Sequence, residues 1–346
     1  MSEIMTTSAG SGDPGRRPED NKPLLVVDGL RVEYSGDARS VIGADRVSFT
    51  IGRGEVLGLA GESGCGKSTT ANAIMRLLKP PAEITHGSII FDGRDVLGMS
   101  AEELRRFRWR EVAMVFQSAM NALNPVMTVG DQIIDVLTTH ERVSKREARE
   151  RAAELLGVVG IPADRLRSYP HQLSGGMRQR AVIAIGLALN PSLLIMDEPT
   201  TALDVVVQQE IMEQVTELKD RLGFSILFIT HDISLMVDIS DRMGVMYGGR
   251  LVEMGPSKEI FSDPLHPYTR ALMGAFPPIS GPRVRRTGLS DSRDGADRPW
   301  ARSIADLVEV TPGRWVSPVH GEQPRPASAP SHGKPSQTDY ANKELS

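Results

Sequence analysis

Residues 61–68 read Gly61-Glu62-Ser63-Gly64-Cys65-Gly66-Lys67-Ser68, which matches the phosphate-binding pattern G-x-x-x-x-G-K-[ST]. A short apolar segment, residues 56–60, precedes the pattern, and a helical pattern follows from Thr69 to Leu78. The glycines allow the backbone to curl with its N–H groups toward phosphate oxygens, and the helix N-terminus adds partial positive charge. We therefore predict that residues 61–69 bind nucleotide phosphates, with Lys67 at the β- and γ-phosphates and Ser68 on Mg²⁺. The alternative is an ordinary glycine-rich turn before a helix.

A second motif follows an apolar segment far downstream. Residues 192–196 lead into Asp197-Glu198-Pro199, which indicates a buried parallel strand with two carboxylates at its C-terminal end. Ligands bind at that edge of open α/β sheets. We predict that Asp197 holds Mg²⁺ through its water shell and that Glu198 polarises the water attacking the γ-phosphate. Taken alone, Glu198 would be a solvated loop charge; the phosphate loop favours the catalytic role.

Between these motifs lies Leu173-Ser174-Gly175-Gly176-Met177-Arg178-Gln179-Arg180, followed by an apolar helical segment, residues 181–189. With this segment the chain resembles the ATP-binding cassette (ABC) ATPases, whose signature is L-S-G-G-Q; Met177 stands where the family has Gln. The resemblance covers residues 24–278. It implies an α/β fold: an ABC-type P-loop domain with a mixed β-sheet core and a helical signature subdomain at about residues 118–189.

The resemblance also assigns roles to residues outside these three motifs. It implies that Tyr34 stacks on adenine, that Gln117 senses Mg²⁺ and touches a membrane partner, and that His231 contacts the γ-phosphate. Asp204, in Ala202-Leu203-Asp204, matches the loop that crosses to a partner cassette. Each position has a simpler alternative: Tyr34 packed on a strand, Gln117 ending a strand, and His231 as a satisfied core residue.

A further implication of the resemblance is that one cassette is incomplete by itself. Ser174, Gly175 and Gly176 offer a hydroxyl and N–H groups at the start of a helix, which suits a phosphate. In the family this site caps ATP bound to another subunit, so that two cassettes sandwich two ATP molecules head to tail.

Composition agrees with a single large α/β domain. The chain has 346 residues, 40% of them hydrophobic, and a formal net charge of -4, which gives no electrostatic footprint for nucleic acid. Its one cysteine, Cys65, excludes an intrachain disulfide and favours a reducing compartment. No apolar stretch approaches the roughly 20 residues needed to span a bilayer. Residues 1–23 are expected to be a disordered lead-in, 24–281 the ATPase domain, and 282–346 a mostly disordered tail.

A narrower resemblance appears near the C-terminal side of the cassette. Asp263-Pro264-Leu265-His266-Pro267-Tyr268, continuing to Phe276-Pro277-Pro278, is similar to the oligopeptide/dipeptide importer ATPases, and to their dipeptide D-like subunit in particular. This implies a second, non-identical ATPase, two permease subunits, an extracytoplasmic solute-binding protein, and a peripheral position on the cytoplasmic face of the cell membrane.

Two departures from the subfamily pattern affect the expected cofactor and solute. Many members carry a cysteine cluster after this segment, but with Cys65 alone a four-thiolate iron–sulfur cluster cannot form. The loop at residues 118–122, which faces the permease in the family, is also unusual, so a β-linked oligosaccharide is an alternative solute. A soluble ABC protein without a permease and a non-catalytic ATP-binding regulator are further alternatives.

Because every nucleotide motif precedes residue 282, deletion of the tail is expected to leave ATP binding intact.

Overall fold

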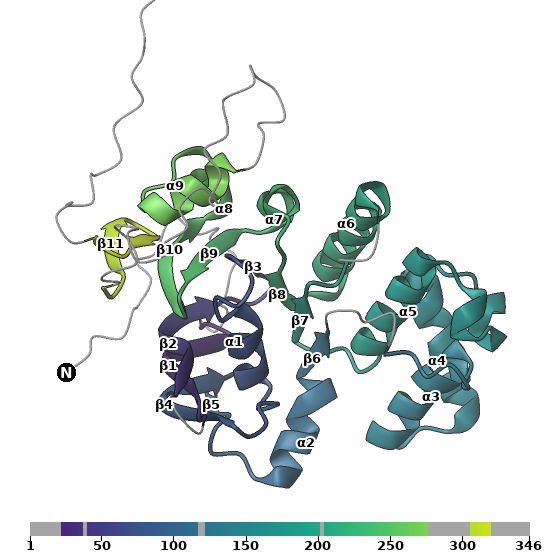
Figure 1. The fold of residues 1–346 in the computed structure, drawn as a ribbon. Coiled ribbons are helices and arrows are strands. Elements are labelled where there is room, and N and C mark those ends of the chain that lie inside the picture. The colour runs from purple at the N-terminus through teal and green to yellow at the C-terminus, as the bar shows by residue number, and fades with distance from the viewer. Residues whose placement is uncertain (1–21, 37–39, 117–121, 201–203, 276–304, 320–346) are drawn as a thin grey trace, which may run out of the picture.

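The computed structural model describes residues 22–36, 40–116, 122–200, 204–275 and 305–319. At its centre lies an eight-stranded sheet with the order β11-β12-β10-β9-β3-β8-β7-β6 (Figure 1). The strands β9, β3, β8, β7 and β6 are parallel, and β10, β12 and β11 extend the sheet in antiparallel fashion. Their bounds are β3 Val56–Ala60, β6 Val112–Val115, β7 Leu193–Asp197, β8 Ser225–Ile229, β9 Arg242–Tyr247, β10 Arg250–Pro256, β11 Val308–Thr311 and β12 Arg314–Val316.

A second, antiparallel sheet has the order β2-β1-β4-β5. Its strands are β1 Leu25–Tyr34, β2 Val41–Ile51, β4 Ala82–Phe91 and β5 Arg94–Asp95. The helix α1, Lys67–Ile74, contributes to the core that this sheet shares with the eight-stranded one. The sequence predicted a helix reaching Leu78, but Arg76 adopts a left-handed conformation with φ 49°, which ends the helix sooner.

Each buried parallel strand divides its side chains between two cores, as the two-residue period of a strand requires. Leu193 and Ile195 of β7 face the core shared with the smaller sheet, whereas Leu194 and Met196 face the core on the opposite side. Phe107 joins the first core from α2, Ala101–Arg110. The remaining helices supply the second core and are α3 Val129–His140, α4 Lys145–Val158, α5 Gly175–Leu187, α6 Val205–Leu222, α7 Ile233–Ile239, α8 Ser257–Ser262 and α9 Pro267–Gly274.

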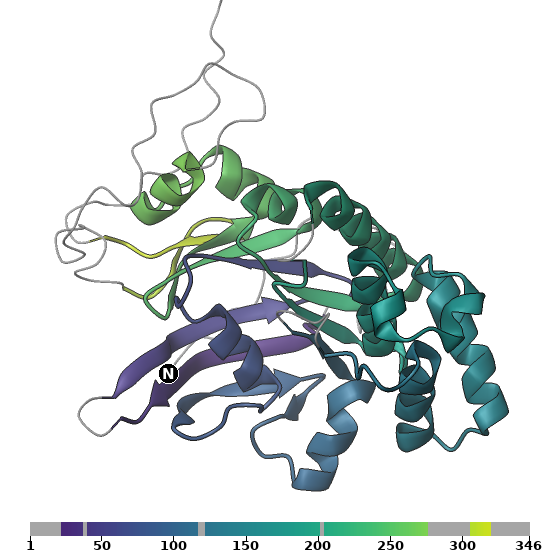
Figure 2. The ribbon, with the colours of Figure 1, turned by 45° about the vertical axis from the view of Figure 1, so that its right-hand side comes forward.

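The helices α3, α4 and α5 form a lobe beside the edge of the large sheet at β6, at the right of Figure 1 and again in Figure 2. Two short 3₁₀ helices, η3 Ala163–Arg167 and η4 Pro170–Gln172, connect α4 to α5. Ser144 caps α4 by accepting a hydrogen bond from the N–H of Glu147 at 3.2 Å. This lobe is the helical signature subdomain predicted from the sequence.

The C-terminal segment differs from its expected state over residues 305–319. These residues were assigned to a mostly disordered tail, but β11 and β12 form a hairpin that pairs with β10. The turn at Pro312-Gly313 fits this arrangement, because Gly313 has φ 77°, which glycine adopts without strain. The large sheet therefore includes a piece of chain beyond the expected domain boundary at residue 281.

Candidate nucleotide-binding site

The phosphate loop connects the C-terminal end of β3 to the start of α1 and is pressed against its neighbours. Gly61, Gly64 and Gly66 have φ values of 145°, 78° and 109°. A Cβ at Gly61 would lie 2.3 Å from the carbonyl oxygen of Met246, and one at Gly66 would lie 2.3 Å from that of Gly43. Only glycine fits at these two positions, so the loop has the tight curl that the sequence pattern predicted.

Lys67 is the first residue of α1, and its ammonium group lies over the loop. Its Nζ donates to the carbonyl oxygens of Gly61 at 2.8 Å and Glu62 at 2.9 Å. The residue is 6% exposed, and no described carboxylate forms an ion pair with it. A buried cation needs a counter-charge, and a phosphate in the curl of the loop would supply one.

Ser68 and Asp197 bring two oxygen ligands together from different elements. The Oγ of Ser68 donates to Oδ1 of Asp197 at 3.0 Å, which joins α1 to the end of β7. Burial raises the pKa of Asp197, and the charge of Glu198 raises it further, whereas Ser68 and Lys67 act in the opposite direction. The negative charge on Asp197 is therefore costly in the free protein, and a bound cation would offset this cost. Mg²⁺ prefers oxygen ligands, so this carboxylate and the adjacent Ser68 hydroxyl suit it.

Glu198 and His231 lie together at the same edge of the sheet. The Glu198 Oε2 and His231 Nδ1 atoms are 3.8 Å apart, with the side chains 20% and 65% exposed. Glu198 has φ 47°, and its N–H donates to the carbonyl of Ile229 at 2.8 Å. A non-glycine residue in this conformation is uncommon, and such residues occur in turns and at active sites. Here it turns the chain directly after Asp197, the last residue of β7.

Tyr34 is also close to the loop. Its hydroxyl is 3.0 Å from Oγ1 of Thr69 in the first turn of α1, and its ring lies against Gly43 of β2, where a Cβ would be 2.5 Å from Cε2. The structure thus places this half-buried ring beside the phosphate loop. Its stacking on adenine stays a prediction.

The signature residues lie in the helical lobe, apart from the phosphate loop. Ser174 caps α5 by accepting a hydrogen bond from the N–H of Met177 at 3.3 Å, and Gly175 and Gly176 open the helix. Figures 1 and 2 both place α5 in the lobe and α1 beneath the large sheet. The signature segment and the phosphate loop of one chain therefore lie apart, and the binding of phosphate by the signature segment stays a prediction.

The remaining predicted positions are divided between the described and the undescribed parts of the chain. Asp204 caps α6, because its Oδ1 accepts a hydrogen bond of 3.0 Å from the N–H of Val207. This structural role was not predicted from the sequence. Gln117, Ala202 and Leu203 lie outside the described residues.

One residue that contacts the loop was missed as a site residue. The hydroxyl of Tyr268, on α9, accepts a hydrogen bond of 3.1 Å from the N–H of Glu62. The His266-Pro267-Tyr268 segment was noted only for its family resemblance. No local pattern indicates that its tyrosine reaches a loop 206 positions earlier in the chain.

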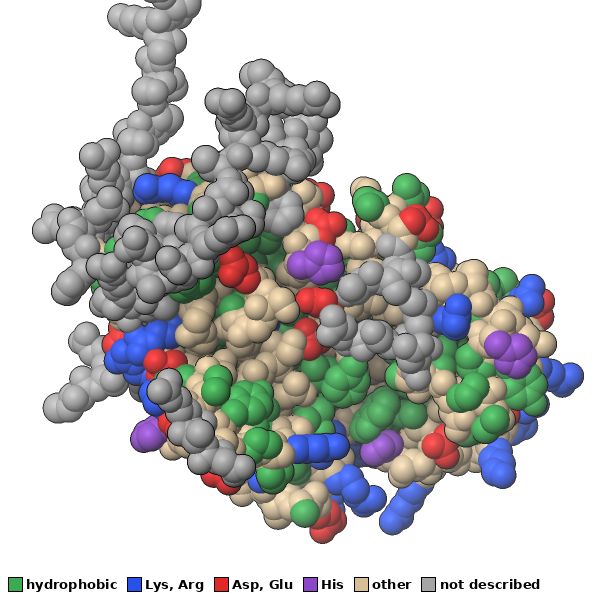
Figure 3. All heavy atoms as spheres, in the orientation of Figure 1, with side chains coloured by type: hydrophobic (Ala, Val, Ile, Leu, Met, Phe, Trp, Pro, Cys, Tyr) green, Lys and Arg blue, Asp and Glu red, His purple; other side chains and the backbone are tan. Residues whose placement is uncertain are grey.

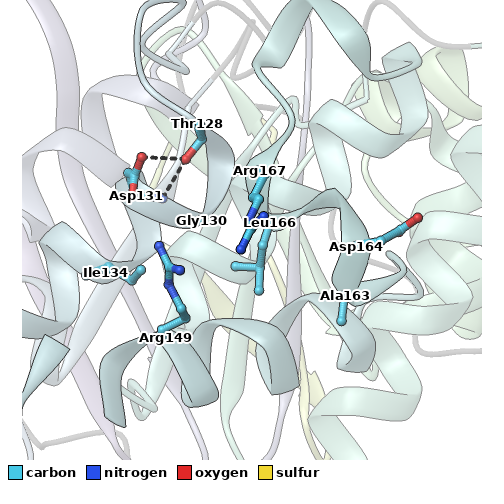
Figure 4. A pocket seen from close by; sticks show the side chains of 9 residues that line it. All are labelled: Thr128, Gly130, Asp131, Ile134, Arg149, Ala163, Asp164, Leu166 and Arg167. Atoms are coloured by element: carbon cyan, nitrogen blue, oxygen red, sulfur yellow. Dashed lines mark hydrogen bonds between the residues drawn. The ribbon is translucent and has the colours of Figure 1, made fainter. Parts of the chain in front are cut away.

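A hollow of about 610 Å³ opens in the helical lobe, away from the nucleotide motifs (Figure 4). Arg149 and Arg167 point toward it, and among the described residues neither forms an ion pair. Its other lining residues are Thr128, Gly130, Asp131, Ile134, Ala163, Asp164 and Leu166. Since none of these belongs to a nucleotide motif, the chemistry is assigned to the loop and not to this hollow.

Across residues 22–36, 40–116, 122–200, 204–275 and 305–319, there is no group of three or more His, Cys, Asp or Glu side chains arranged to hold a metal ion. Over the same ranges, no helix has the length and apolar character required to span a membrane.

Comparison with known proteins identifies the family. The model described as "ABC transporter" matches residues 44–201, and the one described as "Oligopeptide/dipeptide transporter, C-terminal region" matches residues 252–298. The chain is 48% identical over 262 residues to "Oligopeptide transport ATP-binding protein OppD" of Bacillus subtilis (strain 168), covering 74% of this chain and 72% of that protein. It is 45% identical over 257 residues to "Dipeptide transport ATP-binding protein DppD" of the same organism, covering 73% and 77%.

A solved structure shows the same fold. "Dimeric structure of a post-hydrolysis state of the ATP-binding cassette MJ0796 bound to ADP and Pi" matches with a TM-score of 0.61 at 29% identity, over 67% of this chain and 98% of that one.

The fold and the loop define a P-loop ATPase of the ATP-binding cassette class. The chain belongs to the ABC transporter ATP-binding proteins, in their oligopeptide/dipeptide branch. The predicted fold class, the family, the ATPase activity and ATP with Mg²⁺ as cofactors are thereby confirmed. ABC ATPases of importers work as dimers with membrane permease subunits.

Proposed function

We propose that this chain hydrolyses ATP to drive the uptake of oligopeptides or dipeptides through a separate membrane permease. The observation that carries the proposal is the match of residues 252–298 to the oligopeptide/dipeptide transporter region, together with where part of that segment lies. Within it, β10 continues the nucleotide-binding sheet, and Tyr268 bonds to the phosphate loop. Relatives named as oligopeptide and dipeptide transport proteins support the same solute class.

The residues at the sheet edge suit phosphoryl transfer to water. Lys67 would exchange its bonds to loop carbonyls for the β- and γ-phosphates, while Ser68 and Asp197 would hold Mg²⁺. The metal supplies positive charge against the charge that develops on the transferred group. Glu198 would take the proton of the attacking water, and His231, whose Nδ1 lies 3.8 Å from Glu198 Oε2, would contact the γ-phosphate.

The separation of the signature segment and the phosphate loop supports a partner cassette. Because Ser174 lies in the helical lobe and not over its own phosphate loop, it would cap ATP held by a second subunit in a head-to-tail sandwich. The matched structure is itself dimeric. We propose a non-identical ATPase as this partner, in line with the importer resemblance.

A permease would contact the junction between the large sheet and the helical lobe. Trp109 and Phe116, which flank β6, are 36% and 45% exposed, and Phe116 directly precedes residues 117–121, which lie outside the described part of the chain. Figure 3 shows hydrophobic side chains gathered between the sheet and the lobe. Exposed aromatic side chains of this kind favour a protein partner. This contact would hold the chain peripherally at the cytoplasmic face of the membrane, with a solute-binding protein on the other side.

Reconstitution would test the proposal and its alternatives. The chain would first be purified with its membrane partners to identify the permease, the second ATPase and the solute-binding protein. The complex would then be placed in vesicles, and ATP-dependent uptake of labelled peptides and β-linked oligosaccharides would be compared, with Glu198→Gln as the inactive control. Peptide uptake supports the proposal, and oligosaccharide uptake alone would replace its solute. Failure to recover any permease would favour a soluble ABC protein, and ATP binding without turnover in the complete complex would favour a regulator.

A further inference from the structure

Tyr268 connects the C-terminal part of the domain to the phosphate loop. Its side chain is fully buried, and its ring packs on that of Tyr247 with centroids 4.6 Å apart. Its hydroxyl accepts the N–H of Glu62 at 3.1 Å. A buried hydroxyl bonded to a backbone N–H fixes the direction of that N–H, since the alternative leaves both groups unsatisfied.

The peptide unit that Tyr268 holds is the one that also holds Lys67. The N–H of Glu62 and the carbonyl of Gly61 belong to one planar peptide, and Lys67 Nζ donates to that carbonyl at 2.8 Å. Tyr268 and Lys67 thus hydrogen-bond to the two opposite edges of one peptide group, its N–H and its carbonyl. A rotation of this plane would move the Lys67 ammonium and the curl of the loop together.

The helix that carries Tyr268 is itself firmly anchored. His266 caps α9 by accepting the N–H of Tyr268 on Nδ1 at 3.2 Å. Burial, aided by the charge of Arg270, lowers the pKa of His266 to about 4, so that the imidazole is neutral and Nδ1 can accept. The backbone N–H groups of Leu265 and His266 donate to the two carboxylate oxygens of Glu253 at 3.0 and 2.9 Å.

Arg314 of the C-terminal hairpin completes this anchor. Its Nη2 donates to Glu253 Oε1 at 3.1 Å, with the side chains 3% and 0% exposed, and it also donates to the carbonyl of Asp263. A buried carboxylate left without its cation is strongly destabilising. The carboxylate that holds the start of α9 therefore depends on a residue from beyond position 304.

We propose that Tyr268 is a positioning residue for the phosphate loop, and that the Arg314–Glu253 pair keeps it in place. The C-terminal hairpin is then part of the ATP-binding apparatus, contrary to the expectation that removing residues 282–346 leaves ATP binding intact. The inference rests on the proposed function only in taking residues 61–69 as the site of the ATP phosphates.

The first test compares two tyrosine variants in the full-length chain. Tyr268→Phe removes the hydroxyl that holds Glu62, and Tyr247→Phe removes a hydroxyl from the other ring of the same pair, one that bonds to no described residue. We expect Tyr268→Phe to raise the Kd and KM for Mg-ATP about three- to ten-fold with little change in kcat, because phosphate binding is weakened in ground and transition states alike. The loop amides should also exchange hydrogen faster. Tyr247→Phe should match the parent in both measurements.

The inference would be overturned if Tyr268→Phe matched the parent in ATP affinity and in the hydrogen exchange of the loop amides. A lowered Tm alone would then indicate a purely structural role, which changes only stability. Failure of the parent itself to bind Mg-ATP, measured beside Lys67→Ala, would instead remove the proposed function and this inference with it.

The second test addresses the hairpin. Arg314→Met leaves Glu253 buried and unpaired; since it can fail to fold, it is accompanied by the double variant Glu253→Gln, Arg314→Met, which buries no charge. The control is Asp306→Asn, which removes only the exposed pair of Arg46 and Asp306 from the same segment. We expect the folded double variant to bind Mg-ATP several-fold more weakly and Asp306→Asn to bind it normally. Parent-like affinity in the double variant would show that the hairpin does not act on the loop.

Discussion

The Oγ of Ser68 donates a hydrogen bond of 3.0 Å to Oδ1 of Asp197, which joins the first turn of α1 to the end of β7. Asp197 is 5% exposed, and burial, together with the charge of Glu198, raises the pKa of its carboxyl group. A carboxyl group with a raised pKa in the folded state binds protons more tightly there than in the unfolded chain. Its ionisation therefore lowers stability as the pH rises from the unfolded value, about 3.9, through the folded one.

Asp197→Asn should consequently stabilise the nucleotide-free protein while abolishing Mg²⁺-dependent turnover. Asn keeps an oxygen that accepts from Ser68 but carries no charge. We expect its Tm in EDTA to exceed that of the parent by a few degrees at pH 7–8, with the difference closing near pH 4. Thermal melts across this range measure it. A variant less stable than the parent at pH 8 would show that ionised Asp197 is not costly in the free protein.

Glu198→Gln should reduce kcat by about 10²-fold or more while nucleotide binding persists, because a general base contributes about 10²–10⁴-fold. Gln retains the size of the side chain and leaves the backbone bond to Ile229 intact. Steady-state hydrolysis and equilibrium binding of Mg-ATP would be measured together. Lys67→Ala is the contrasting variant, since it should weaken binding itself. Hydrolysis by Glu198→Gln at the parent rate would require another base.

The sequence predicts the parts of the site whose geometry is set locally. Gly61 and Gly66 are needed where a Cβ would meet a neighbouring carbonyl, and Asp197 follows an apolar strand that could only be buried. Helix α6 begins at Val205 and ends at Leu222, which follows from local sequence, because its apolar residues recur at helical spacing and Gly223 ends it with φ 76°.

Contacts between distant segments could not be predicted in the same way. The bond of Tyr268 to Glu62 and the Arg314–Glu253 pair join residues 206 and 61 positions apart, and neither pair produces a period or a spacing within one segment. The hairpin around Pro312-Gly313 did carry a local turn signal. The hairpin was not predicted because the surrounding tail is rich in Pro, Ser and Arg, which indicates disorder. This composition was given more weight than the short stretch of alternating apolar and polar residues that forms the strands.

Purified protein should contain no stoichiometric iron. Cys65 is the only cysteine of the chain, and burial raises the pKa of its thiol, which disfavours the thiolate that a metal ligand requires. Metal analysis and visible absorbance of protein purified without oxygen would measure this. Iron near one or more atoms per chain would contradict it.

Ser174 and Ser144 make possible a matched test of the two-cassette sandwich. Both are exposed serines that cap a helix of the lobe, accepting an N–H at 3.3 and 3.2 Å respectively, but only Ser174 opens the signature helix. Replacing either by Arg costs a cap, about 1 kcal/mol, and adds one charge. Only at Ser174 would the bulky arginine occupy the space where the signature helix must contact ATP bound to the partner cassette.

With Glu198→Gln holding ATP unhydrolysed, Mg-ATP should drive association with a second cassette, and a non-identical partner should associate more strongly than a second copy. Adding Ser174→Arg should abolish this association, whereas Ser144→Arg should leave it within about two-fold of the parent, since capping losses are equal and only the phosphate contact differs. Size-exclusion chromatography with light scattering on the chain, alone and with its partner, measures both. Equal dimer formation by the two arginine variants would place the signature helix outside the interface, and monomers at saturating Mg-ATP in every pairing would contradict the sandwich itself.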